Sequence, residues 1–64
     1  MAREPKEIFE LIVKADERLK YANPTNMEVR KEQAGELLRE ALAAAKEIGN
    51  EQLVAQAEQR LSDL

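Results

Sequence analysis

The chain has 64 residues, of which 44% are hydrophobic and 36% are charged, and its formal net charge is −3. This length predicts one domain (1–64) whose single core supplies no more than about 3–5 kcal/mol of stability. The chain has no Cys and no His, which excludes disulfides, thiolate zinc sites and imidazole ligands, so we expect no cofactor. The balance of charge and hydrophobicity favours a folded domain over a disordered tail.

Charge and hydropathy also argue against nucleic-acid and membrane binding. Lys and Arg are spread along a net acidic chain, so the basic patch of a nucleic-acid binder is missing. The longest apolar run, 41–45, is far shorter than the ~20 residues of a membrane-spanning helix. Residues 1–5 contain no apolar stretch like that of a signal peptide. The sequence therefore predicts a cytoplasmic protein that binds neither nucleic acid nor membrane.

The first predicted helix covers residues 5–22. Pro5 suits a first helical turn, because the missing N–H of proline leaves no bond unmade there. Glu7 places a negative charge near the positive end of the helix dipole. Asn23 precedes Pro24, whose ring disfavours the helical conformation at the residue before it, so the helix should stop there.

The second predicted helix covers residues 26–48. Thr25 and Glu28 fit the S/T-x-x-E capping box, in which the threonine accepts from the Glu28 N–H and the glutamate side chain reaches back. At the other end, Gly49 can take the left-handed conformation that terminates a helix. Gly35 lies inside this helix, where it costs about 0.5–1 kcal/mol relative to alanine; a close contact or chance would explain it.

Asn50 is the expected N-cap of a third helix, residues 51–63. The two connections are short, so successive helices should pack antiparallel, which predicts an all-α, up-down-up antiparallel three-helix bundle. Apolar residues recur on one stripe of each helix and are the expected core. These residues are Ile8, Leu11, Ile12, Ala15, Leu19, Ala22, Met27, Ala34, Leu37, Leu38, Ala41, Leu42, Ala45, Ile48, Leu53, Val54, Ala57, Leu61 and Leu64.

Residues 30–61 resemble part of a tetratricopeptide repeat, a helix-turn-helix unit that stacks into protein-binding solenoids. Ala34, Leu38 and Ala41 reproduce the small, large and small pattern of a second repeat helix, and residues 41–50 resemble a junction between repeats. The chain departs from the family in its longer first connection and in a first helix without the aromatic and glycine pattern. The resemblance implies binding of a peptide or protein along a groove between helices.

Four glutamates recur at every fourth position of the second predicted helix: Glu28, Glu32, Glu36 and Glu40. We call them the acidic ladder and expect them on one solvent side of the helix, partly relieved by Lys31 and Arg39 at i,i+3 spacing. We interpret the ladder as an ordinary solvated face. The alternative is an acidic face that binds a basic partner or a divalent metal.

Two further surface features are candidates for partner contact. Phe9 and Val13 lie one turn apart beside the core stripe of the first helix, and they either widen the core face or form a dimer or ligand contact. The third helix carries a strip of low charge formed by Gln52, Gln56 and Gln59. Such a strip is easier to desolvate than one of Lys and Glu; ordinary polar surface is the alternative.

The sequence offers no catalytic machinery. Ser62 is the only serine, and no histidine is present to activate it. Tyr21 is expected to pack on Pro24 near the first connection. We therefore expect no enzyme and no small-molecule substrate, but a protein-interaction or structural module that binds a protein partner or associates with itself. A designed origin is disfavoured by Gly35, the strip of three glutamines and the imperfect charge pairing.

Overall fold

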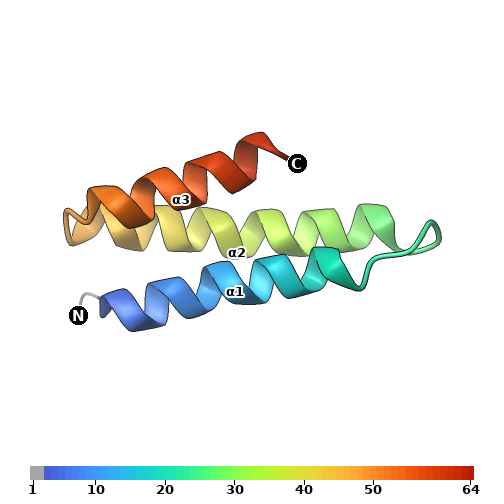
Figure 1. The fold of residues 1–64 in the computed structure, drawn as a ribbon, viewed down its shortest axis with the longest axis horizontal. Coiled ribbons are helices and arrows are strands. Elements are labelled where there is room, and N and C mark those ends of the chain that lie inside the picture. The colour runs from blue at the N-terminus through green and yellow to red at the C-terminus, as the bar shows by residue number, and fades with distance from the viewer. Residues whose placement is uncertain (1–2) are drawn as a thin grey trace.

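A computed structural model describes residues 3–64 of the chain, so the first two residues of the predicted domain lie outside it. The elements are three helices, α1 (Pro5–Lys20), α2 (Met27–Glu47) and α3 (Glu51–Ser62). Successive helices run antiparallel, and α1 and α3 both pack against α2 (Figure 1). The predicted all-α three-helix bundle is confirmed.

The first and third helices start as the sequence indicates. Pro5 occupies the first position of α1, and the Glu7 carboxylate accepts a hydrogen bond from the Glu4 N–H at 3.2 Å. The side chain of Asn50 caps α3 by accepting from the Leu53 N–H at 3.1 Å. In both cases a side chain satisfies a backbone donor that the helix itself leaves unpaired.

The first helix ends earlier than predicted, whereas the second ends as expected. After Lys20 the Ala22 N–H donates to the Leu19 carbonyl at 3.2 Å, a tight turn that replaces the next α-helical bond. α2 ends at Glu47, and Gly49 has a φ of 69°. An L-residue rarely adopts this left-handed conformation, so the glycine is needed to end α2.

The predicted capping box at Thr25 is wrong. The N-cap of α2 is Asn26, and its side chain makes no capping bond. The Asn23 side chain instead accepts from the N–H groups of Thr25 and Asn26, both at 3.0 Å, and the Asn26 side chain accepts from the Asn23 N–H at 2.8 Å. Asparagine side chains readily mimic turn hydrogen bonds, and this reciprocal pair fixes Thr25 within the connection, before the helix begins.

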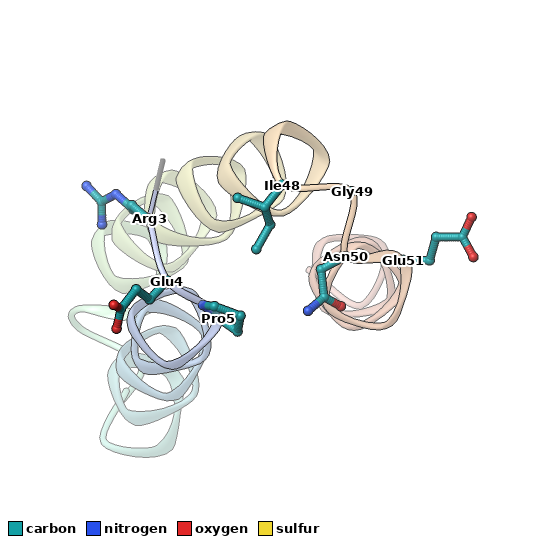
Figure 2. Close-up of a pocket in the computed structure, with 7 residues that line it drawn as sticks. All are labelled: Arg3, Glu4, Pro5, Ile48, Gly49, Asn50 and Glu51. Atoms are coloured by element: carbon teal, nitrogen blue, oxygen red, sulfur yellow. The ribbon is translucent and has the colours of Figure 1, made fainter. Parts of the chain in front are cut away.

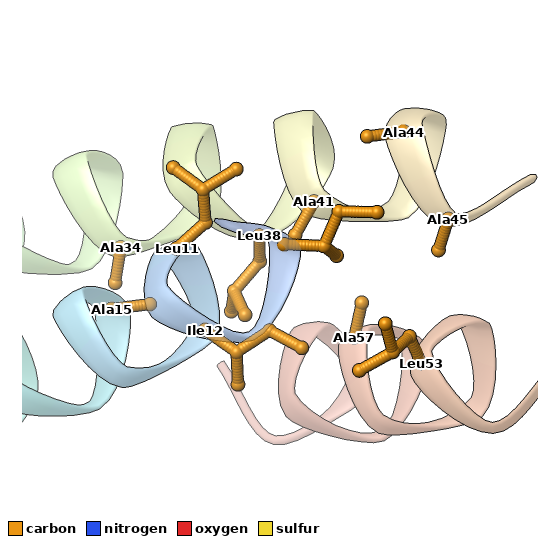
Figure 3. Packing of buried hydrophobic residues seen from close by; sticks show 11 residues of the cluster. Leu11, Ile12, Ala15, Ala34, Leu38, Ala41, Ala44, Ala45, Leu53 and Ala57 are labelled. Carbon is orange, nitrogen blue, oxygen red and sulfur yellow. The ribbon is translucent and has the colours of Figure 1, made fainter. Parts of the chain in front are cut away.

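The core consists of side chains from all three helices, as the apolar stripes predict (Figure 3). Its largest fully buried members are Ile8, Ile12 and Leu38. Small side chains supply most of the α2 contribution and allow neighbouring helices to approach closely. The buried hydrophobic residues are Ile8, Leu11, Ile12, Ala15, Ala34, Leu38, Ala41, Ala44, Ala45, Leu53 and Ala57; of these, Ala44 was not predicted.

Packing is unequal, because α1 and α3 both contact α2 extensively but contact each other much less. α3 is also short and ends beside the middle of α2, where a Cβ atom built on Gly35 would lie 3.6 Å from Leu64 Cδ1. Met27 lies eight residues before Gly35, about 12 Å along the helix axis and beyond the reach of α3. It is therefore 38% exposed, and its predicted place in the core is wrong.

Candidate functional site

An ion pair joins α1 directly to α3. Arg60 Nε donates to both carboxylate oxygens of Asp16, at 2.9 and 3.1 Å, across 44 positions of sequence. The same guanidinium contacts the Gln56 carbonyl oxygen at 3.5 Å. The Asp16–Arg60 contact identifies the sides of α1 and α3 that face each other. We call the surface along these two facing sides the α1/α3 seam.

Phe9 and Val13 lie on the α1 side of this seam. Phe9 precedes Asp16 by seven residues, which on an α-helix places the two side chains within about 20° of one direction. Val13 lies about 60° from Asp16 by the same rule. Val13 is partly buried, but Phe9 is 48% exposed. The interpretation that Phe9 widens the core is wrong, because the sparse contact between α1 and α3 leaves about half of this residue open to solvent and outside the core cluster.

The predicted glutamine strip divides between the seam and open solvent. Gln56 is half-buried and lies one turn from Arg60, about 40° around the helix, whereas Gln52 is exposed and lies about 80° from Arg60. Gln59 lies about 100° from Arg60 around the helix. Its Nε2 donates to Asp63 Oδ1 at 3.3 Å. The structure therefore brings one of the three glutamines, Gln56, to the seam.

A pocket of about 670 Å³ opens between the first turns of α1 and α3. Figure 2 shows Pro5 and Asn50 facing each other across it, with the Ile48 side chain pointing into the space between them. Sequence reasoning interpreted Pro5 and Asn50 only as helix-start residues, and their meeting depends on the pairing of α1 with α3. The lining residues are Arg3, Glu4, Pro5, Ile48, Gly49, Asn50 and Glu51.

The acidic ladder is exposed along α2 but is not gathered into a site. Each four-residue step turns about 40° around a helix, so three steps carry the ladder about 120° around α2 instead of along one face. Glu40, at its end, forms an ion pair with Arg3. Within residues 3–64 no group of three or more carboxylates is arranged to hold a metal ion, so the structure gives the metal alternative no support.

No helix among residues 3–64 combines the length and apolar character that crossing a membrane requires. The resemblance to tetratricopeptide repeats remains a prediction based on the sequence pattern. No protein-family model, curated protein or solved structure matches this chain.

Proposed function

We propose that this chain is a non-catalytic interaction module that binds a protein segment along the α1/α3 seam. The observation that carries the proposal is the half-exposed ring of Phe9, on the side of α1 that the Asp16–Arg60 ion pair joins to α3. Exposed aromatic rings and low local charge are both characteristic of the central part of protein interfaces. The tetratricopeptide resemblance also implies binding between helices, and it supports the proposal by analogy.

The chemistry of the seam defines the partner. An apolar side chain of the partner covers Phe9 and Val13, while its backbone or amide groups pair with Gln56. Fully burying a phenylalanine contributes about 1.5–3 kcal/mol, so covering the exposed half of Phe9 adds about 1 kcal/mol. One such contact cannot hold a partner by itself, so both sides of the seam must take part.

Selection from a random-peptide display library, followed by titration of the enriched peptides, tests the proposal. Replacement of Phe9 by serine should weaken binding about fivefold or more, the equivalent of about 1 kcal/mol. Val29→Ser is the matched control, because Val29 is 55% exposed but lies on α2, away from the seam. Equal loss of peptide affinity in the Phe9→Ser and Val29→Ser variants would refute the proposal, and so would the absence of any enriched peptide.

Self-association through the same surface is a separate outcome. Sedimentation equilibrium over a range of concentrations measures it directly. A dimer that dissociates on Phe9→Ser replacement identifies the seam partner as a second copy of the chain. A dimer that survives the replacement places the self-contact elsewhere on the molecule and leaves the peptide titration as the test of the seam.

A further inference from the structure

The other end of the bundle carries a second, positively charged pocket. It has a volume of about 410 Å³ and is lined by Lys14, Glu17 and Arg18 of α1, by Tyr21 directly after that helix, and by Arg30 at the start of α2. Three cations and one carboxylate give it a formal charge of +2, in a chain whose net charge is −3.

Among residues 3–64, no carboxylate lies within salt-bridge distance of the three cations, Lys14, Arg18 and Arg30. Within residues 3–64, ion pairs with N–O distances up to 4.0 Å join only Arg3 to Glu40 and Arg60 to Asp16. Arg18 makes one side-chain contact, from its Nη1 to Gln33 Oε1, at the long distance of 3.4 Å. The guanidinium and ammonium groups of the pocket therefore keep their donors for a ligand.

Tyr21 adds an aromatic ring to the pocket. It is 65% exposed, so its predicted packing against Pro24 does not cover the ring. The Lys20 ammonium lies 5.6 Å from the ring centroid, a distance at which a cation is attracted to the face of a tyrosine. A ligand that carries a ring beside its anionic group has an apolar surface to contact at Tyr21.

From this combination we propose that the pocket formed by Lys14, Arg18, Arg30 and Tyr21 binds a phosphate monoester. A phosphate monoester carries up to two negative charges above its second pKa of about 6 and presents three acceptor oxygens at one point. The guanidinium groups of Arg18 and Arg30 and the ammonium group of Lys14 provide N–H donors for these oxygens. A carboxylate supplies one charge and two oxygens, so it leaves half of the +2 charge uncompensated. This site is independent of the α1/α3 seam.

The direct test is an NMR titration of the whole chain with phenyl phosphate at pH 7.5, with sodium chloride at equal ionic strength as the blank. We expect saturable shifts at Lys14, Arg18 and Arg30, and weaker binding of inorganic phosphate, which lacks a ring for Tyr21. At pH 5.0 the affinity should fall severalfold, because most of the phosphate then loses one negative charge. Shifts no larger than those caused by chloride would overturn the proposal.

Variants separate a specific site from general charge attraction. Arg30→Gln and Lys14→Gln should each weaken phenyl phosphate binding about tenfold, as expected for loss of one charge-assisted hydrogen bond. Lys31→Gln removes the same charge from the neighbouring position of α2, outside the pocket lining, and should leave binding unchanged. Far-UV circular dichroism checks that each variant is folded. Equal weakening in all three variants would show that net charge alone attracts the phosphate.

The source of the phosphate is read from a second titration, with a phosphoserine peptide and its unphosphorylated form. Tighter binding of the phosphopeptide than of phenyl phosphate assigns the pocket to a modified protein, and tighter binding of phenyl phosphate assigns it to a small molecule. Equal binding of the phosphorylated and unphosphorylated peptides would count against a phosphate site. Phe9→Ser should leave all of these affinities unchanged, so this proposal and that of the seam fail separately.

Discussion

Replacing Gly35 with alanine should stabilise the bundle, because this glycine occupies a helix interior without a steric need to be there. Alanine is favoured over glycine at such a position by about 0.5–1 kcal/mol. A Cβ atom at position 35 would lie 3.2 Å from Arg39 Nη1 and 3.6 Å from Leu64 Cδ1. The first contact involves the end of a flexible, exposed side chain, which can move away at little cost. The second is an ordinary van der Waals distance.

Thermal and urea unfolding, followed by circular dichroism at 222 nm, measure this effect. In a domain of this size 1 kcal/mol changes Tm by about 4–8 °C, so Gly35→Ala should raise it by about 2–8 °C. Gly49→Ala is the matched control: nothing lies within 4 Å of a Cβ there, but its φ of 69° costs an alanine about 1–2 kcal/mol. A lower Tm for Gly35→Ala would refute the reasoning and show that α2 and α3 require glycine at their contact.

Three further substitutions test the caps and the core. Asn50→Ala removes the acceptor of the Leu53 N–H and should cost about 1 kcal/mol in urea unfolding; an unchanged midpoint would contradict the cap. Thr25→Ala should alter stability by less than about 0.5 kcal/mol, because surface changes away from caps are small, whereas a loss of 1 kcal/mol would revive the capping box. Leu38 is fully buried, so Leu38→Ala should cost about 2–5 kcal/mol, comparable with the whole expected stability. The circular-dichroism signal of the Leu38→Ala variant at 222 nm should be largely lost at 25 °C. A cooperative melt with a Tm near that of the parent chain would be incompatible with the core described.

Most of the fold could be predicted because its signals are local. Pro5, Gly49 and Asn50 each act on the backbone within a few residues, and the apolar stripes follow from helical periodicity alone. The first connection was harder, because Thr25 and the asparagine pair offer competing hydrogen bonds to the same short segment. Local patterns show that both arrangements are chemically possible, and only the geometry of the closed turn selects the asparagines.

The candidate site was predictable residue by residue but not as an arrangement. Helical stepping places Phe9 beside the core stripe and Gln56 on a strip of low charge, yet it does not show that they border the same seam. That juxtaposition depends on the Asp16–Arg60 ion pair, whose partners are 44 positions apart. The exposure of Phe9 likewise follows from the weak contact between α1 and α3, which no local pattern encodes.

The most direct test of the account is an amide chemical-shift map of the chain titrated with a display-selected peptide. If the α1/α3 seam is the binding surface, saturable shifts should centre on Phe9, Val13 and Gln56, while Val29 on α2 stays unchanged. Shifts centred on Val29, with Phe9 and Gln56 unaffected, would contradict the proposed function.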